Sequence, residues 1–321
     1  MEAELLRVEE VAELGRAIVI APENVAKDLR EFVGEDVVGG IFPGVIFDGK
    51  VYNDRVVAVR CDFEVYRGSS AANAKGRTLL TILDGWSERA ESLLEDVYAK
   101  LGNSVTYFGG GAGSLNGKID CLFIGKEFFR DDAVFVALRE SFDVAIRHGW
   151  IATERTFFAN RTSGRKIIEL DWEPAFDVYA STLHELGAEL RRENFLDVAK
   201  AYPFSITRAR GEDIVRDPIA VEGDEIVCAG RVAEGSLLRL MRGDKESLIR
   251  AAEFCAEELG CVEITLDCVS RVLYLGEDFR REAKFMRGSF GALTIGEVAC
   301  VRGYPIFHNK TVVMGCRRTN S

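Results

Sequence analysis

Four polar residues in the last third of the chain could together hold a small zwitterionic molecule. Arg271 in VSRV is a cation that can clamp a carboxylate with two N–H groups, and Glu297 in IGEV is an anion that can hold an ammonium. Asn309 and Thr311 would add neutral hydrogen-bonding groups. We expect all four at strand ends or adjoining loops, where binding groups gather on a rigid frame. The alternative is that Arg271 and Glu297 simply pair with each other across neighbouring strands.

The glycine-rich stretch YFGGGAGSLNGK at residues 107–118 raises the question of a phosphate-binding loop. In such a loop the glycines end a strand and a helix starts at once with Gly-Lys-Ser/Thr. Here Gly-Lys is followed by Ile119 and further strand, and no GxGxxG spacing fits. Glycines inside a strand instead mark a close approach of another backbone or of a ligand. Gly109, Gly110 and Gly111 therefore either allow close strand packing or line a pocket with backbone N–H groups.

Enzyme motifs are missing from the sequence. The three histidines, His148, His184 and His308, form no recognisable catalytic set, and the chain has neither GxSxG nor HExxH. We therefore predict no catalytic residue and no metal site. His308 is a secondary candidate for ligand contact. The alternative function is an enzyme acting on a small metabolite, with Glu297 or His308 as its general base.

The eight cysteines include no CxxC pair, and several lie inside apolar, strand-like runs. Without a secretory signal, this pattern predicts buried reduced thiols rather than a disulfide framework or a zinc site.

Composition limits the classes of function further. The chain has 321 residues, is 47% apolar and carries a formal net charge of -11, so it can form two domains with sizeable cores. Its acidity argues against a nucleic-acid partner and against an anionic membrane surface. The N-terminus is acidic where a signal peptide would be basic, and no apolar run is long enough to cross a bilayer. We predict a soluble, cytoplasmic protein.

Three segments repeat the order strand, helix, strand, strand, which predicts a repeated β-α-β-β unit. In each copy glycines punctuate the second strand, and a later segment carries an aromatic and two polar residues before the closing strand. The copies comprise residues 17–21, 23–34, 36–42 and 55–61; residues 78–85, 87–102, 104–110, 118–125 and 133–139; and residues 261–269, 277–288, 289–300 and 310–316.

Between the second and third copies lies a mixed region. Strands are predicted to residue 170, a helix from Pro174 to about residue 186, helix near 190–200, and then two strands joined at Gly223-Asp224. A further amphipathic helix follows, with Asp244 as its cap. The fold class predicted is α/β, with mixed sheets flanked by helices in two closely packed parts. We place the domain boundary between residues 1–172 and 173–321.

With these segments placed, the chain resembles the FIST family, named for F-box and intracellular signal transduction proteins. The resemblance covers about residues 17–316. It rests on TLLTILDG, FGGGAG and RHGW with IIELDWEPAFDVY in the first part, and on DPIAVEGDEIVCAGRVAEGSLLRLMRGD, DCVSRVLYLG and GALTIGEVA with FHNKTVV in the second. Two positions depart from the family pattern. Ser270 stands where the family usually has glycine, and Lys310 stands at a glutamine-like position.

The resemblance implies a sensory module that binds a small ligand, an amino acid or a relative, in an α/β scaffold with FIST N-terminal and C-terminal domains. A sensor of this size would signal through a separate partner protein. Haem is a recognised use of the scaffold and would need one axial histidine or cysteine. Since the chain has no CxxCH, we predict no cofactor and keep a haem-binding sensor as an alternative.

We therefore expect non-catalytic recognition of a small polar metabolite where the two parts meet. The expected site contains Arg271, Glu297, Asn309 and Thr311, with His308 second. An assembly scaffold without a ligand is a third possibility.

Overall fold

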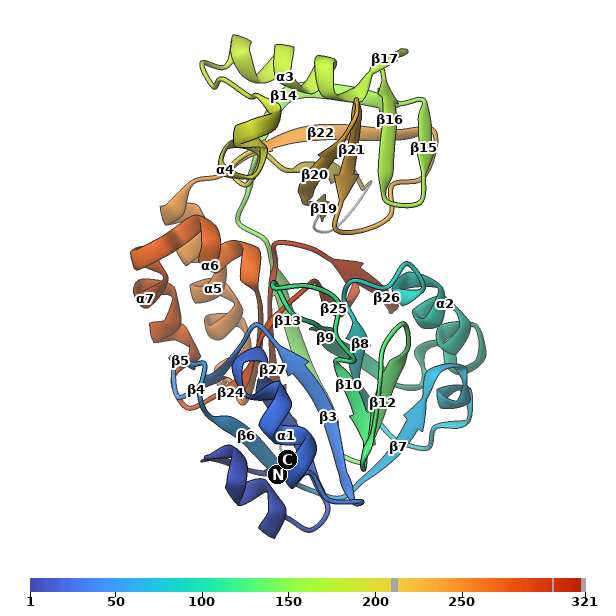
Figure 1. The fold of residues 1–321 in the computed structure, drawn as a ribbon, viewed down its shortest axis with the longest axis vertical. Coiled ribbons are helices and arrows are strands. Elements are labelled where there is room, and N and C mark those ends of the chain that lie inside the picture. The colour runs from blue at the N-terminus through green and yellow to red at the C-terminus, as the bar shows by residue number, and fades with distance from the viewer. Residues whose placement is uncertain (209–212, 302, 319–321) are drawn as a thin grey trace.

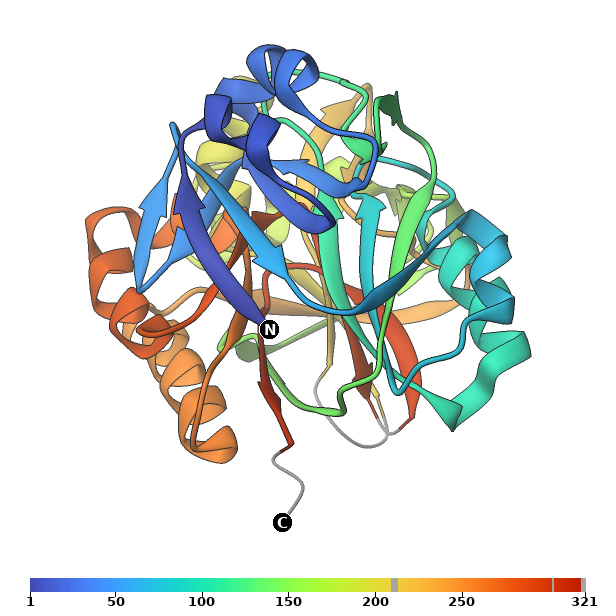
Figure 2. The ribbon, with the colours of Figure 1, turned by 90° about the horizontal axis from the view of Figure 1, so that it is seen from below.

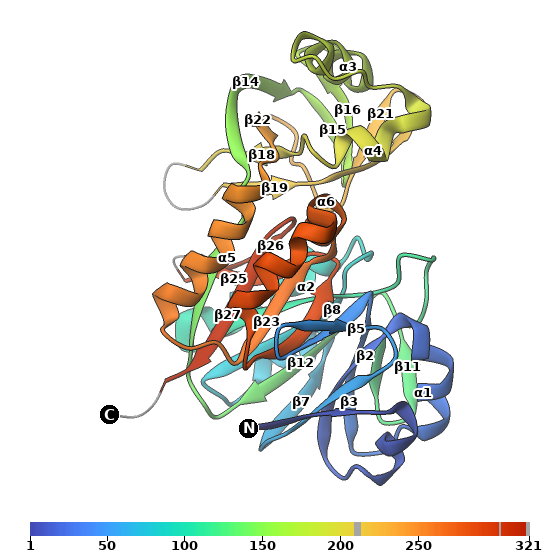
Figure 3. The same cartoon turned by 90° about the vertical axis from the view of Figure 1, so that its left-hand side faces the viewer.

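The structure is a computed structural model that describes residues 1–208, 213–301 and 303–318. Its chain is divided between a large body and a smaller lobe (Figure 1). The lobe is the part of the chain from β14 (Ile151–Ala159) to β22 (Ser236–Arg242). Figure 3 shows the lobe standing on one end of the body.

The body contains three copies of one β-α-β-β unit. The first consists of β2 (Ala17–Pro22), α1 (Ala26–Phe32), β3 (Val37–Phe42) and β6 (Val56–Arg60). The second consists of β8 (Thr78–Asp84), α2 (Ala90–Leu101), β9 (Thr106–Ala112) and β12 (Ala133–Leu138). The third consists of β23 (Ile264–Cys268), α6 (Val269–Leu275), α7 (Phe279–Glu282), β24 (Phe290–Thr294) and β27 (Val312–Arg317).

Pairing within the units is the same in all three copies. The first two strands run parallel, and the last strand pairs antiparallel with the first. Parallel neighbours need a crossover, and a helix supplies it in each unit. The prediction of an α/β fold with mixed sheets built from repeated β-α-β-β units is therefore confirmed.

Each unit also contributes a hairpin to the sheet of another unit. The hairpins are β4 (Gly44–Phe47) with β5 (Lys50–Tyr52), β10 (Leu122–Ile124) with β11 (Glu127–Phe129), and β25 (Glu297–Val301) with β26 (Tyr304–His308). The first unit's hairpin pairs with β24, the second unit's with β3 and the third unit's with β9. The exchange is cyclic, and Figure 2 shows the three units around a common centre.

Every body sheet is completed by an edge strand beside the last strand of its unit. These strands are β1 (Glu2–Leu6) on β6, β7 (Phe63–Arg67) on β12 and β13 (Phe142–Arg147) on β27. The three six-stranded sheets thus share one order: β1-β6-β2-β3-β10-β11, β7-β12-β8-β9-β25-β26 and β13-β27-β23-β24-β4-β5.

One glycine position is repeated in the three parallel strand pairs. A Cβ atom built on Gly109 would lie 1.9 Å from the carbonyl oxygen of Thr81 on β8. Gly39 and Gly291 occupy the same place in the other two units, with corresponding distances of 1.8 and 1.7 Å. A side chain cannot fit there, so the neighbouring strands approach closely only because these residues are glycine.

The described residues of the lobe form two small sheets, two α-helices and an apolar core. One sheet has the order β14-β22-β18-β19, with β18 (Phe204–Ile206) and β19 (Ile214–Arg216). The other has the order β15-β16-β21-β20, with β15 (Arg161–Ser163), β16 (Lys166–Leu170), β21 (Glu225–Cys228) and β20 (Pro218–Glu222), and the short β17 (Glu173–Pro174) pairs with β16. The helices are α3 (Ala175–Glu185) and α4 (Phe195–Ala199). The predicted boundary after residue 172 falls inside the lobe.

Helix α5 (Lys245–Leu259) returns the chain from the lobe to the body, and its ends follow the sequence rules. The Asp244 side chain caps it by accepting a hydrogen bond from the Ser247 N–H, and Gly260 ends it in a left-handed conformation. Its buried face, which includes Leu248 and Cys255, packs in the core beneath α6 and α7.

The third unit differs from its prediction in several places. The strand expected over residues 289–300 is divided into β24 and β25, which belong to different sheets, and the helix expected over residues 277–288 contains the short α7. We expected strand through residue 269 and helix from residue 277, but α6 begins directly after β23. Arg271 therefore lies within a helix and not at a strand end. Among the described residues, no helix is long and apolar enough to cross a membrane.

Candidate functional site

A hollow of about 440 Å³ lies between the lobe and the body. Its lobe side includes Leu196 on α4 and Asp217, which precedes β20. Its body side includes Ser270 on α6 and the loop residues Asn309 and Lys310. Figure 3 shows α4 of the lobe above α6 of the body.

The body side of the hollow lies at the carboxyl ends of two parallel strand pairs. Trp86 follows β8 and Leu115 follows β9, while Cys268 ends β23 and Ile295 follows β24. Ligands of open α/β sheets bind at this edge, because loops from neighbouring strands converge there. The repeated fold therefore brings segments of the second and third units to one place.

A buried ion pair forms part of the lining. The Lys310 Nζ atom lies 3.1 Å from Oδ1 of Asp217, with the two side chains 0% and 6% exposed. The Ser270 hydroxyl donates to Oδ2 of the same carboxylate at 2.6 Å. A buried charge without a partner is costly, so this network fixes the lobe residue Asp217 against two body residues.

Lys310 is further held by its surroundings. Its Nζ donates to the carbonyl oxygen of Lys200 at 3.0 Å and lies 4.5 Å from the ring centre of Trp150. Its backbone has φ +58°, a left-handed conformation that a residue with a side chain adopts only at a cost. Such strain often occurs at functional sites.

The amide of Asn309 adds a neutral polar group to the lining. The side chain is 1% exposed, and its Oδ1 atom accepts no hydrogen bond from the described residues. A buried carbonyl oxygen without a donor is unfavourable by itself. A ligand's donor group would reach this atom only if neighbouring groups moved, because the atom is itself buried.

Apolar side chains make up much of the remaining wall. Leu115, Leu196 and Leu273 are 44%, 59% and 56% exposed although they are large and apolar. They come from three separate segments and all line the same hollow. Isolated exposed leucines need no explanation, but three around one hollow indicate a surface that something apolar covers.

The predicted anion, Glu297, lies in the protein core beside this hollow but not on its lining. Its side chain is 0% exposed and accepts hydrogen bonds from the hydroxyl of Thr294 at 2.6 Å and from the hydroxyl and N–H of Thr311 at 2.7 and 3.1 Å. Burial raises the pKa of Glu297 to about 7, although these hydrogen bonds oppose the rise. Thr311 is likewise buried, at 1% exposure.

The guanidinium of the predicted cation, Arg271, is bound by other groups of the protein. Its guanidinium donates to both carboxylate oxygens of Glu282, at 3.2 and 2.8 Å, and Nε lies 3.0 Å from Asp267. It also donates to the carbonyl oxygens of His148, at 2.5 Å, and of Leu248, at 2.9 Å. Arg271 is 0% exposed and does not line the hollow, so neither the expected ligand clamp nor the expected pairing with Glu297 is present in this geometry.

His308 and the glycine run lie next to Glu297 in one sheet. The strand register places Glu297 opposite His308 on β26 and opposite Gly110 on β9. Burial lowers the pKa of His308 to about 3, and neither ring nitrogen hydrogen-bonds to a described residue.

The glycines at residues 109–111 allow neighbouring strands to pack closely and do not line the hollow. A Cβ atom on Gly110 would lie 2.4 Å from Thr294, and one on Gly111 would lie 2.0 Å from the carbonyl oxygen of Ile295. With Gly109 packed against β8 as described above, Gly109, Gly110 and Gly111 are all outside the lining. The close-packing alternative fits this geometry.

Of the eight residues expected to contact a ligand, Asn309 lines the hollow. Sequence reasoning did not predict that Asp217 or the exposed leucines of the lining (Leu115, Leu196 and Leu273) belong to the site. A signal did exist for two other lining residues, because Ser270 and Lys310 are the two departures from the family pattern noted above. Both contact Asp217.

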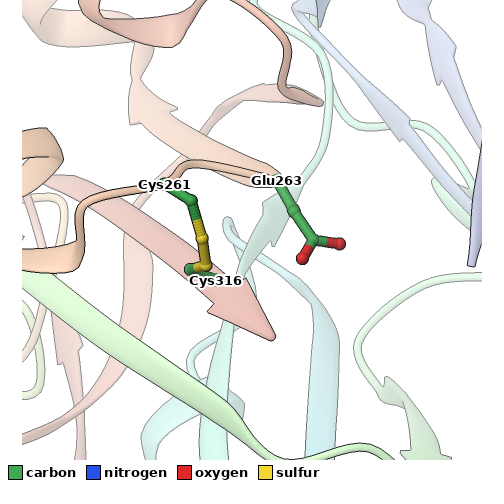
Figure 4. A group of neighbouring side chains, drawn as sticks. All are labelled: Cys261, Glu263 and Cys316. Carbon is green, nitrogen blue, oxygen red and sulfur yellow. A yellow bond between two sulfur atoms is a disulfide. The ribbon is translucent and has the colours of Figure 1, made fainter. Parts of the chain in front are cut away.

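Cys261, Glu263 and Cys316 lie together at the opposite end of the third unit (Figure 4). Cys261 and Cys316 are joined as a disulfide, which corrects the expectation of reduced thiols for this pair. Their sulfurs and the carboxylate are close enough to suggest metal ligands. However, Glu263 is already paired with Arg317 at 2.5 Å, and disulfide sulfurs are not thiolates.

Comparison with known proteins identifies the family of this chain. One curated relative is "Uncharacterized protein MJ1623" of Methanocaldococcus jannaschii, which is 23% identical over 302 aligned residues. The match covers 81% of this chain and 58% of that protein. Residues 17–173 match the FIST N domain and residues 175–300 match the FIST C domain. FIST domains are sensor domains of signal transduction. Since these two matches account for most of its length, the chain belongs to the FIST family.

Proposed function

We propose that this protein is a non-catalytic sensor that binds an amino acid or a related small metabolite in the hollow between lobe and body. The observation that carries the proposal is the hollow itself, which combines the buried Asp217–Lys310 pair with an apolar wall. Ligand sites are usually concave and mostly apolar, with a few fixed polar groups. A volume of about 440 Å³ is large enough for an amino acid.

The positions of the two candidate bases favour binding over catalysis. Glu297 and His308 are both 0% exposed and are absent from the lining. A general base must come within hydrogen-bond reach of the proton it removes. In the hollow, the carboxylate of Asp217 is already engaged by Lys310 and by the Ser270 hydroxyl.

The placement of the hollow suggests how binding could be relayed. A ligand there would contact Leu196 and Asp217 on the lobe and Ser270 and Asn309 on the body. It would thus favour one relative position of the two parts, as any ligand favours the conformation that it binds more tightly. We propose that a separate signalling protein in the cytoplasm detects this position, and that no cofactor takes part.

A thermal-shift screen of amino acids and related metabolites tests the proposal. A ligand that binds the folded state alone raises the unfolding temperature with concentration, in accordance with mass action. We expect at least one member to do so, and mass spectrometry to recover it chemically unchanged. Asn309→Ala should weaken the shift, while Asn73→Ala, an exposed asparagine away from the hollow, should not. Turnover of the compound would instead support an enzyme.

A further inference from the structure

We infer that the hollow recognises its ligand through an amino group and an apolar body, and that the ligand's carboxylate contributes little. This inference rests on the proposed function and specifies the chemical class of its ligand.

The first argument concerns Lys310, the buried cation of the lining. An ammonium has three N–H donors. The surroundings of Nζ already include the Asp217 carboxylate at 3.1 Å, the Lys200 carbonyl oxygen at 3.0 Å and the Trp150 ring at 4.5 Å. These partners surround Nζ and Lys310 is 0% exposed, so a ligand carboxylate could bind it only by displacing one of them.

The second argument concerns the acceptors. A carboxylate offers about four lone-pair sites. Asp217 uses one oxygen for Lys310 and the other for the Ser270 hydroxyl, which leaves further acceptor capacity on both. This spare acceptor capacity favours a ligand with several N–H groups, and the negative charge of Asp217 favours a cation.

Among the described lining residues, the other cation, Lys200, would bind a ligand carboxylate only weakly. Lys200 lines the hollow with its side chain 43% exposed, 3.6 Å from Asp197. Ion pairs at such solvent-exposed positions contribute about 0–1 kcal/mol. A carboxylate would therefore gain little there, and one placed deeper would be repelled by Asp217.

The third argument concerns the exposed leucines. Leu115, Leu196 and Leu273 surround the hollow on loop, lobe and body segments, and each is about half exposed. An apolar group of the ligand that covers them removes apolar surface from water and stabilises the complex. A ligand with an amino group but no apolar body, such as glycine, would leave the leucines uncovered.

Three compounds with the same branched apolar group distinguish the contribution of the amino group to binding from that of the carboxylate. They are leucine, 3-methylbutylamine, which lacks the carboxylate, and 4-methylpentanoate, which lacks the amino group. We expect calorimetry to give leucine and the amine dissociation constants within about tenfold of each other. The acid should bind at least about 100-fold more weakly, because it loses the charged hydrogen bonds. Glycine should also bind much more weakly than leucine.

Variants place the binding in this hollow. Leu273→Ser and Leu196→Ser should each weaken leucine and amine binding several-fold. Leu237→Ser is the matched control, since Leu237 is 52% exposed on β22 and outside the lining. Asp217→Asn should weaken the amine more than it weakens the acid. Because that change leaves Lys310 without its anion, Asn309→Ala provides a second measurement in which no buried charge loses its partner.

The outcomes separate this inference from the proposed function. If 4-methylpentanoate or glycine binds as tightly as leucine, the inference is wrong while the sensor function stands. Equal affinity of the Leu273→Ser and Leu237→Ser variants also overturns it. If no compound of the series and no other amino acid binds, the proposed function fails together with the inference.

Discussion

The carboxylate of Glu297 accepts two hydrogen bonds from Thr311, one from its hydroxyl at 2.7 Å and one from its backbone N–H at 3.1 Å. The two residues belong to β25 and to the loop before β27, so this contact fixes the third unit's hairpin to its last strand. Sequence reasoning selected both residues for a ligand. The structure shows them bound to each other in the core.

The raised pKa of Glu297, about 7, makes stability depend on pH at this residue. In the unfolded chain the group titrates near pH 4.5. Between these values the folded protein holds a proton that the unfolded chain lacks, so the stabilising effect is complete below pH 4.5 and is lost as the pH rises through 7. The free energy of unfolding of Glu297→Gln, measured relative to that of the wild type, should therefore rise by on the order of 3 kcal/mol between pH 4.5 and pH 8. Urea unfolding of both proteins at several pH values measures this, and a pH-independent difference would show that Glu297 is ionised when folded.

Replacing Arg271 should damage the fold without changing ligand selectivity. Arg271→Met leaves Glu282 and Asp267 buried without their cation, which should cost about 3–5 kcal/mol of unfolding free energy. Burial and the neighbouring Glu282 already raise the pKa of Asp267. Denaturant unfolding gives the loss, and calorimetry on the remaining folded protein gives the affinity. A stable variant that no longer binds the wild-type ligand would mean that Arg271 is a ligand-binding residue.

The Lys310–Asp217 pair lends itself to a double-mutant cycle. Lys310→Met and Asp217→Asn should each cost about 3 kcal/mol, because each leaves a polar partner buried. The double variant should cost less than the sum of the two, with an interaction energy of about 1–3 kcal/mol. Chemical unfolding of the four proteins yields this value. Strict additivity would mean that the two side chains do not interact in solution.

Gly109→Ala should prevent the second unit from forming its parallel strand pair. The added methyl group would overlap the carbonyl oxygen of Thr81, and backbone atoms of paired strands cannot move away cheaply. Gly15→Ala is the matched control, since nothing lies within 4 Å of its Cβ position, and it should change stability by less than about 0.5 kcal/mol. Soluble yield and circular dichroism compare the two. Normal unfolding of Gly109→Ala would contradict the strand register.

Thiol titration checks the cysteine pair. Six of the eight cysteines lie outside the Cys261–Cys316 disulfide, so denatured protein should react with six equivalents of a thiol reagent before reduction and eight after it. On the chain-entropy account, closing a loop across 55 residues stabilises the fold by about 4 kcal/mol. Without reductant, Cys316→Ser should therefore unfold at a lower urea concentration than the wild type. With reductant, this difference should disappear. Eight thiols before reduction would mean that the pair is not bonded.

The repeated units could be predicted because apolar runs of strand length alternate with amphipathic helices three times. The cyclic exchange of hairpins could not, since which sheet edge a hairpin joins depends on packing between distant segments. Helix α6 was missed for a local reason: Val269–Leu275 follows β23 without a loop and reads as apolar strand.

The candidate site could be predicted only in part. Asn309 could be predicted as a neutral hydrogen-bonding group in a loop beside a strand, but burial decides which of its neighbours reach a cavity. Asp217 lies far along the chain from Ser270 and Lys310, and it contacts them only because the lobe folds back onto the body. The domain boundary after residue 172 stays a prediction.

The ladder between β4 and β24 joins residues far apart in the sequence, with Phe47 opposite Phe290. During synthesis the hairpin of the first unit has no neighbouring strand until β24 has left the ribosome. The sheets of the first two units depend in the same way on strands made later. A nascent or truncated chain consequently exposes unpaired strand edges, which are prone to aggregation.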